Sequence, residues 1–202
     1  MKLALRATVN RIYSTSVASS IRISLRSLST APDMQDDHFI ARDDQISQIN
    51  ERYTGSLQIQ DCEKFGKGVF SQRSFRAGEF LVSSQAMKET KFRDTHTIQK
   101  DWNIHVVMDL PAVLINHSCA ANAGVKDNAR GAYDFYATRD ILEGEEIFLD
   151  YEAVEAEIEG FPCSCGSSSC RENLKGFKHN GDIVKDQYGR EFIASYLKTH
   201  TK

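Results

Sequence analysis

The stretch LINHSCAAN, residues 114–122, places an apolar run directly before a cluster of short polar side chains. Asn116, His117 and Asn122 would carry a desolvation cost if they were buried without hydrogen-bond partners or a ligand. Cys119 adds a thiol to the same cluster. Taken alone, the cluster could be only a polar turn, so its meaning depends on the segments around it.

A second cluster, FPCSCGSSSC at residues 161–170, offers the three thiols of Cys163, Cys165 and Cys170 at a spacing typical of metal ligands. The glycine and serines between them favour the tight turn that such a site needs. Disulfides are disfavoured, because the chain has five cysteines and no secretory signal. A structural zinc ion would need a fourth ligand, and the chain offers four candidates: Cys62, Cys119, His117 and His179.

Composition predicts one globular domain, since the 202 residues are 41% hydrophobic and 26% charged. No apolar run approaches the roughly 20 residues that a membrane span requires. Residues 1–32 carry a net charge of +5, and because the whole chain carries −3, residues 33–202 carry −8. We therefore expect a body that binds basic protein segments and does not bind nucleic acid directly.

Residues 1–36 are rich in arginine and serine and contain no acidic residue before Asp33, with apolar residues interleaved. This pattern is typical of organelle transit peptides. We expect a mitochondrial leader, with a plastid leader as the alternative. If the segment is not a leader, the protein would be nuclear or cytosolic.

The remainder divides into a linker at 37–55 with a short helix at 45–52, and a β-rich region over 56–152. Short apolar or alternating runs predict its strands: 57–60, 68–70, 80–84, 96–99, 104–110, 112–117, 133–138 and 146–151. A C-terminal helix is predicted in EFIASYLKTH, residues 191–200, with one apolar face formed by Phe192, Ile193, Tyr196 and Leu197.

The order of the motifs is more specific than any one of them. GKGVF at 66–70 is followed by NHSC at 116–119, then ATRDILEGEEIFLDY at 137–151, then the three-cysteine cluster. This succession resembles the SET-domain protein lysine methyltransferases that carry a post-SET zinc segment. The resemblance implies a mostly β, β-clip-like fold of several small antiparallel sheets with a pseudoknot. It places the SET domain at 56–152, the post-SET segment at 160–176 and a helical extension at 177–202.

The resemblance also implies residue roles for methyl transfer from S-adenosylmethionine to a lysine in an extended segment of a protein. Tyr151 would be catalytic, and Leu149 and Tyr133 would line the lysine channel. The cofactor would contact Gly66, Lys67, Gly68, Asn116, His117, Tyr151 and Leu174. One structural zinc ion would be held by Cys119, Cys163, Cys165 and Cys170, leaving Cys62 as a free thiol. We expect a monomer.

Three features depart from the family's pattern. Ala121 stands where proline is usual, Leu149 stands where phenylalanine or tyrosine is usual, and LVSSQAMKET at 81–90 matches the second motif poorly. The smaller Leu149 side chain favours di- or trimethylation. The acidic residues at 143, 145 and 146 are expected in a solvated turn. A zinc-stapled binding module without turnover is the alternative function, and a redox-active thiol protein is a third.

The leader hypothesis predicts that residues 1–36, fused to a fluorescent reporter, direct the reporter to mitochondria, because the membrane potential draws a basic helix inward. Fluorescence microscopy against a mitochondrial dye measures this, with the reporter alone as the control. A diffuse cytosolic signal would contradict the hypothesis.

Overall fold

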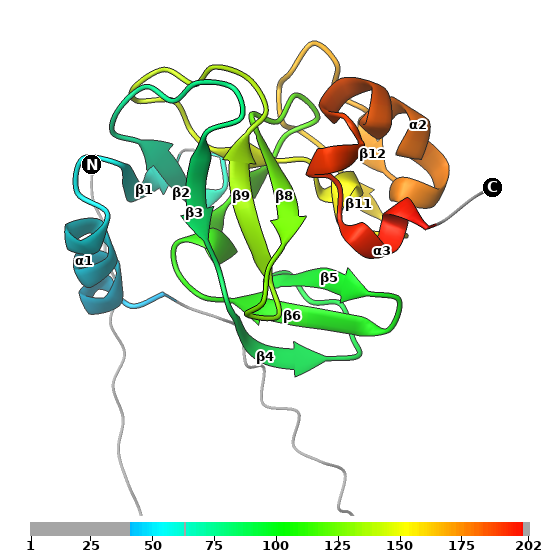
Figure 1. Cartoon of the computed structure of the whole chain (residues 1–202), viewed down its shortest axis with the longest axis horizontal. Helices are drawn as coiled ribbons and strands as arrows, with labels where there is room; N and C mark the ends of the chain where they lie inside the picture. The colour runs from blue at the N-terminus through cyan, green and yellow to red at the C-terminus, as the bar shows by residue number, and fades with distance from the viewer. Residues whose placement is uncertain (1–40, 63, 200–202) are drawn as a thin grey trace, which may run out of the picture. The chain divides into compact units, whose positions relative to one another are not determined.

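The computed structural model describes residues 41–62 and 64–199, so the expected leader at 1–36 lies outside the described residues. These residues form four small sheets and a few short helices (Figure 1). The mostly β fold with several small antiparallel sheets is therefore confirmed. None of the helices in this part of the chain has the length and apolar character to cross a bilayer.

A five-stranded sheet, in the order β3-β9-β8-β10-β7, forms the centre of the fold. Its strands are β3 (Phe80–Ser83), β9 (Tyr133–Ala137), β8 (Ala123–Asp127), β10 (Phe148–Leu149) and β7 (Asn116–His117). Along β9, buried and half-buried side chains alternate, as the YDFYA pattern predicts. Tyr133, Phe135 and Ala137 are fully buried in the hydrophobic core.

The chain crosses itself where β10 enters this sheet. β7 and β8 are joined by residues 118–122, yet β10 lies between them and runs parallel to both. The crossing is held by Asn122, whose Nδ2 donates to Glu146 O at 2.8 Å and whose Oδ1 accepts from Phe148 N at 2.8 Å. Ser118 N also donates to Leu149 O at 3.2 Å. The polar cluster of LINHSCAAN therefore finds the partners that its burial requires.

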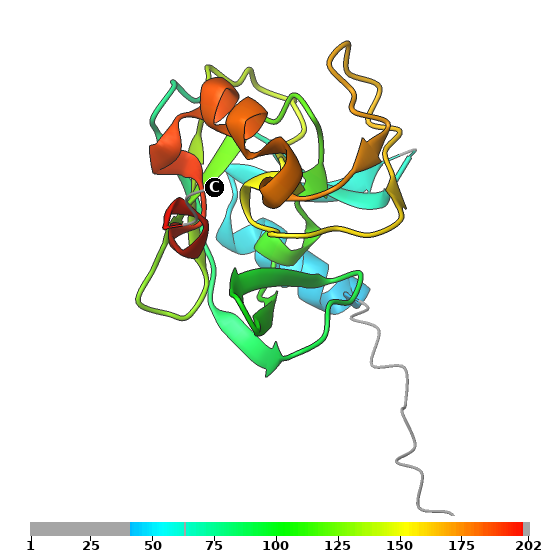
Figure 2. The same cartoon turned by 90° about the vertical axis from the view of Figure 1, so that its right-hand side faces the viewer.

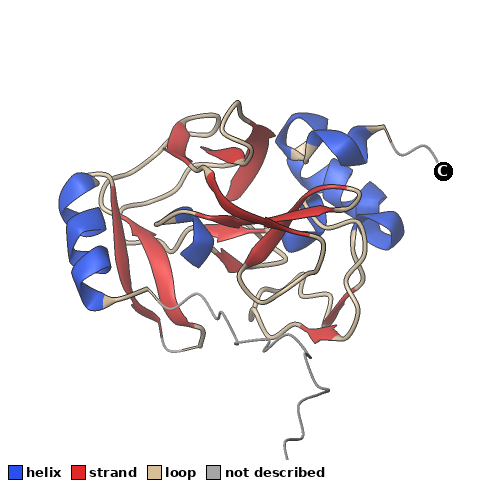
Figure 3. Cartoon of the chain, turned by 90° about the horizontal axis from the view of Figure 1, so that it is seen from below, coloured by secondary structure: helices blue, strands red, loops and turns tan. Residues whose placement is uncertain are grey.

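A hairpin of β1 (Leu57–Cys62) and β2 (Gly66–Ser71) flanks the central sheet and carries α1 (Asp43–Arg52). Figure 3 shows α1 beside this hairpin. The Asn50 side chain fixes the contact, because it accepts from Ile59 N at 2.7 Å and donates to Ile59 O at 3.1 Å. The predicted helix at 45–52 is thus confirmed and begins two residues earlier.

A three-stranded sheet in the order β4-β6-β5 contains β4 (Ala86–Thr90), β6 (Ile104–Met108) and β5 (Thr97–Asp101). The sequence predicted strands close to β5 and β6 and missed β4. This strand is an edge strand with mostly exposed side chains, so it lacks the alternating apolar signal of a half-buried strand.

Two predicted strands are corrected. Residues 112–117 begin as a 3₁₀ helix, η1 (Ala112–Leu114), and only Asn116–His117 form a strand. The helix forms because Val113 N donates to Asp109 O and Leu114 N donates to Pro111 O. Residues 146–151 contribute only Phe148–Leu149. The Asp150 carboxylate then accepts from Glu152 N at 3.1 Å and starts a second 3₁₀ helix, η2 (Tyr151–Ala153).

The C-terminal region is also corrected. The predicted helix at 191–200 is instead a 3₁₀ helix, η3 (Arg190–Phe192), and a short α3 (Ser195–Lys198), separated because Ala194 N donates to Ala153 O. The main helix is α2 (Phe177–Tyr188), which the sequence missed. It follows the short pair of β11 (Phe161–Pro162) and β12 (Asn173–Leu174).

A buried carboxylate holds the two residues that precede α2, whose own first N–H groups, at Phe177 and Lys178, donate to Glu155 O and Ala156 O. Glu152 is fully buried, and its Oε1 accepts from Lys175 N at 2.6 Å and Gly176 N at 2.8 Å. Asn180 Nδ2 donates to both Glu152 oxygens at 2.9 and 3.0 Å. A negative charge at a helix N-terminus is favoured by the helix dipole, so a residue far away in sequence caps this helix.

Candidate functional site

Four cysteines come together where the segment after β10 returns to the central sheet. The Sγ atoms of Cys119, Cys163, Cys165 and Cys170 all lie within 4.8 Å of one another. Cys119 Sγ and Cys163 Sγ are 3.8 Å apart, and a tetrahedral zinc ion with Zn–S bonds of about 2.3 Å requires S–S distances of about 3.8 Å. Four soft thiol donors at this spacing fit a structural zinc ion. Cys62 lies outside this group.

Arg171, directly after the last of these cysteines, connects the cluster to the centre of the fold. Its Nη2 donates to both Asp150 oxygens at 2.6 Å, and its Nη1 lies 3.1 Å from Glu152 Oε2. The Asp150 and Glu152 side chains are only 1% and 0% exposed. Arg171 N also donates to Cys119 Sγ at 3.4 Å.

His117 links the cysteine cluster to Tyr151. Its Nδ1 accepts from Tyr151 N at 3.2 Å, and its Nε2 lies 3.4 Å from Cys119 Sγ. Burial, aided by the nearby Arg171 charge, lowers the pKa of His117 to about 3. The imidazole is therefore neutral at physiological pH. An accepting Nδ1 leaves the proton on Nε2, where it can donate to the Cys119 sulfur.

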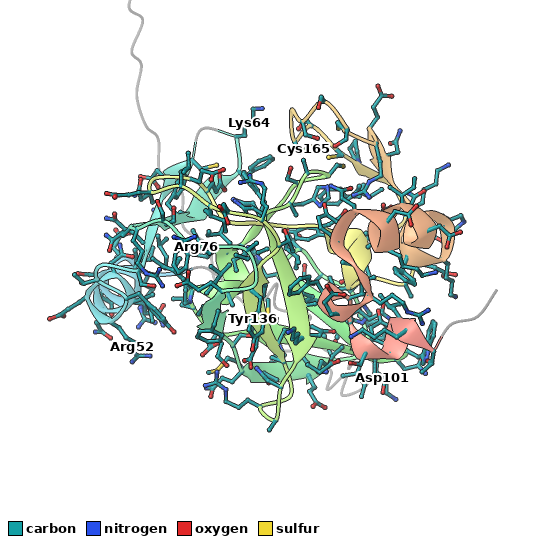
Figure 4. The ribbon with its side chains drawn as sticks, turned by 45° about the horizontal axis from the view of Figure 1, so that its top comes forward. Arg52, Lys64, Arg76, Asp101, Tyr136 and Cys165 are labelled. Atoms are coloured by element: carbon teal, nitrogen blue, oxygen red, sulfur yellow. The ribbon has the colours of Figure 1, made fainter. Side chains whose placement is uncertain are left out.

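Two cavities lie beside the cysteine cluster. The larger, of about 590 Å³, lies between the β1–β2 hairpin and the segment at 163–170, called here the cysteine segment. Phe65 and Lys67 line one side, and Phe161 and Cys165 line the other. Figure 2 shows the cysteine segment extending beside the tip of the hairpin, and Figure 4 places Lys64 close to Cys165 at this opening. Asn116 and His117, both predicted cofactor contacts, also line this cavity.

Gly68 and Glu146 lie behind Asn116 and Lys67, which line the larger cavity. The sequence predicted that Glu146 lies in a solvated turn. Glu146 is half-buried, and its Oε1 accepts from Asn116 Nδ2 at 2.8 Å. Asn116 Nδ2 also donates to Lys67 O at 3.0 Å. A Cβ at Gly68 would lie 2.4 Å from Glu146 Oε1, so only glycine permits this approach. The expected solvated turn is thus wrong for Glu146.

A smaller cavity of about 340 Å³ adjoins the larger one, and Tyr151 and Phe161 line both. Leu149, Ile115 and Glu155 also line it. Tyr151 Oη donates to Ile115 O at 3.2 Å. Burial raises the pKa of Tyr151 to about 12, so its hydroxyl keeps its proton at neutral pH.

Four predicted cofactor or lysine-channel residues do not line either cavity. Gly66 is one of them, although its neighbours Phe65 and Lys67 line the larger cavity. Tyr133 is fully buried, and its hydroxyl donates to Gln99 O at 2.6 Å. Leu174 pairs with Phe161 across β11 and β12 and packs against the cysteine cluster. Gly68 acts through its contact with Glu146. Phe161, the strand partner of Leu174, lines the larger cavity.

Ala121, the departure from the family's usual proline, has a structural role. Its N–H donates to Tyr188 Oη at 3.0 Å, and the same hydroxyl donates to Cys119 O at 3.2 Å. Proline has no N–H and could not make the first bond. Tyr188 at the end of α2 therefore holds the turn that carries Cys119.

Comparison with known proteins agrees with this arrangement. The family model described as "SET domain" matches residues 66–152. The histone-lysine N-methyltransferase ASHH3 of Arabidopsis thaliana is 24% identical over 159 residues, which cover 69% of this chain and 44% of the relative. The H3 lysine-4 specific histone-lysine N-methyltransferase of Schizosaccharomyces pombe is 41% identical over 66 residues, 31% of this chain and 7% of the relative. The chain thus spans less than half the length of these relatives.

Among solved structures, KRYPTONITE in complex with mCHG DNA and SAH is similar with a TM-score of 0.48 and 22% identity, over 57% of this chain and 28% of that chain. The family match covers both β2 and the crossing of β10 through the central sheet, and it ends just after Tyr151. Residues 66–152 of this chain are therefore a SET domain.

Proposed function

We propose that this protein transfers methyl groups from S-adenosylmethionine to lysine side chains of protein substrates. The observation that carries the proposal is the position of Tyr151, which lines two adjoining cavities of different size. A methyl donor and an acceptor that enter from opposite sides would meet beside its hydroxyl. The relatives named as histone-lysine N-methyltransferases support the same reaction class.

The larger cavity suits the methyl donor. Its volume of about 590 Å³ falls within the range of about 300 to 1,000 Å³ that is typical of small-molecule sites. Phe65 and Phe161 offer aromatic surface for the adenine ring, and Asn116 and the Lys67 segment offer polar groups for the amino acid end. When bound, S-adenosylmethionine supplies a methyl group to the lone pair of a neutral lysine nitrogen, with the C–S electrons staying on sulfur.

The smaller cavity suits the lysine side chain. Leu149 and Ile115 give apolar walls for its methylene stem. Tyr151 lines both cavities, and its hydroxyl is bonded to the Ile115 carbonyl. These two polar groups would orient the amine and the methyl group, while the buried walls exclude water. The body's net charge of −8 favours basic substrate segments.

The cysteine cluster is proposed to hold a structural zinc ion. Four thiolates leave no open coordination position, so the ion would join β7 to the segment at 163–170 without a catalytic role. It would thereby fix Phe161, which lies just before Cys163 and lines both cavities.

The zinc proposal predicts that Cys119→Ser lowers bound zinc below one equivalent per chain, because one of four thiolates is lost. Elemental analysis of the purified protein measures this. Cys62→Ser, which removes a thiol outside the cluster, should keep its zinc. Full zinc retention in Cys119→Ser would show that this cysteine is not a ligand.

The methyltransferase proposal predicts that Tyr151→Phe lowers transfer of labelled methyl to lysine on the order of a hundredfold, the size typical of losing one oriented hydroxyl. Whole-cell and organelle extracts provide the substrates. Tyr196→Phe is the matched control, because Tyr196 lines neither cavity and its hydroxyl donates to the backbone carbonyl of Val154. Equal activity of Tyr151→Phe would remove this tyrosine from the mechanism.

A zinc-stapled binding module without turnover is the second candidate, favoured by Ala121, Leu149 and the weakly matched segment at 81–90. The same extract assay separates the two functions. Bound S-adenosylmethionine without any labelled protein would identify the binding module.

Leu149 is proposed to set the degree of methylation. It is 2% exposed and lines the smaller cavity, where its side chain has no hydroxyl to hold a water or restrain the amine. Mass spectrometry of the product should show di- or trimethyllysine, and Leu149→Tyr should shift it toward monomethyllysine. Only monomethyl product from the unchanged protein would contradict this role.

A further inference from the structure

Glu155 is a buried acid in the wall of the smaller cavity that the proposed reaction does not yet use. It follows Tyr151 by one turn, and its N–H donates to Tyr151 O at 2.8 Å. Its side chain is only 4% exposed. The carboxylate therefore lies in a largely dry environment close to the proposed catalytic tyrosine.

The two oxygens of this carboxylate have different surroundings. Oε1 accepts from Gln99 N of β5 at 2.9 Å. Oε2 is buried and accepts no hydrogen bond from any residue in 41–62 or 64–199. Arg93 Nε and His105 Nε2 each lie 3.6 Å from it, which is beyond hydrogen-bond distance. A buried acceptor without a hydrogen bond lowers the stability of the fold. We therefore expect a ligand to supply the missing donor to Oε2.

Arg93 is a counter-ion that could be exchanged. It comes from the loop between β4 and β5, its side chain is 33% exposed, and it lines the smaller cavity. Its guanidinium carbon lies 5.8 Å from the Phe161 ring centre. Arg93 thus balances the carboxylate's charge from the solvent side while leaving Oε2 without a hydrogen bond.

We propose that Glu155 Oε2 binds the ammonium group of the substrate lysine as it enters, before the lysine loses the proton that methyl transfer requires it to lose. The ammonium replaces Arg93 as the partner of the carboxylate. The smaller cavity combines apolar walls at Leu149, Ile115 and Met108 with this buried carboxylate. Such a cavity selects an aliphatic chain that ends in a cation. The inference rests on the proposed function for the identity of the occupant. It makes Glu155 a specificity-determining residue of the same site.

The test uses n-butylammonium, which reproduces the end of a lysine side chain, and measures its binding to the full chain by NMR titration. Glu155→Gln keeps the acceptor for Gln99 N and removes the charge, so it should weaken binding by about tenfold or more. Asp94→Asn is the matched control, because Asp94 also lines this cavity but is exposed. The affinity of this variant for n-butylammonium should change little. Neutral 1-butanol should bind to the unchanged protein and to the Glu155→Gln variant with the same affinity.

Arg93→Gln provides the decisive comparison, since it removes the competing cation and should strengthen n-butylammonium binding. If Glu155 and Arg93 were only a structural pair, both substitutions would weaken binding together, and that result would overturn the proposal. Unchanged affinity in Glu155→Gln, or no binding to the unchanged protein, would overturn it as well.

This experiment needs neither turnover nor the methyl donor. Absence of methyl transfer together with the expected binding pattern would refute the proposed function and leave the cation site in place. Methyl transfer together with unchanged binding in Glu155→Gln would refute the role of Glu155 alone.

Discussion

The buried ion pairs of Arg171 with Asp150 and Glu152 join the end of the central sheet to the segment that carries the cysteines. Asp150 precedes the 3₁₀ helix that contains Tyr151, Arg171 follows the cysteine cluster, and Glu152 caps α2. Removing one partner from a buried pair typically costs about 3–5 kcal/mol, because the remaining charge is left in a dry environment. The two acids cannot be solvated in this fold, so the cysteine segment must return to the central sheet. Both cavities depend on that return, because it positions Phe161.

Tyr151 and Phe161 come from opposite ends of this connection, and both line the two cavities. Tyr151 is fixed from the sheet, since its N–H donates to His117 Nδ1 and its hydroxyl donates to Ile115 O. Phe161 is fixed from the other side by its pairing with Leu174 and by the cysteine cluster. The cluster therefore contributes to the site in two ways: through His117, which bridges Cys119 and Tyr151, and through the strand that carries Phe161.

Local patterns predicted the helix at α1 and most strands, and the order of the motifs predicted the fold class and the four cysteines that the structure brings together. These features have local signals: alternation along β9, cysteine spacing, and short polar groups behind an apolar run. The missed features depend on partners far away in sequence. Helix α2 contains Gly181 and is capped by Glu152, so its own residues predict it weakly. Glu146 and Glu155 lie in runs of acids that are typical of solvated segments, and only the tertiary fold buries them.

The hydrogen bond from Ala121 N to Tyr188 Oη connects the position where the family usually has proline to helix α2. The turn that carries Cys119 is held by a hydroxyl from α2, which accepts from Ala121 N and donates to Cys119 O. A proline at 121 would stiffen the turn by itself but would leave this hydroxyl without its donor. Positions 121 and 188 are thus expected to covary during evolution, because without a proline at 121 the turn depends on Tyr188 of α2. The extension after the cysteine segment is then a constrained part of the domain, and its divergence is limited by the turn that it supports.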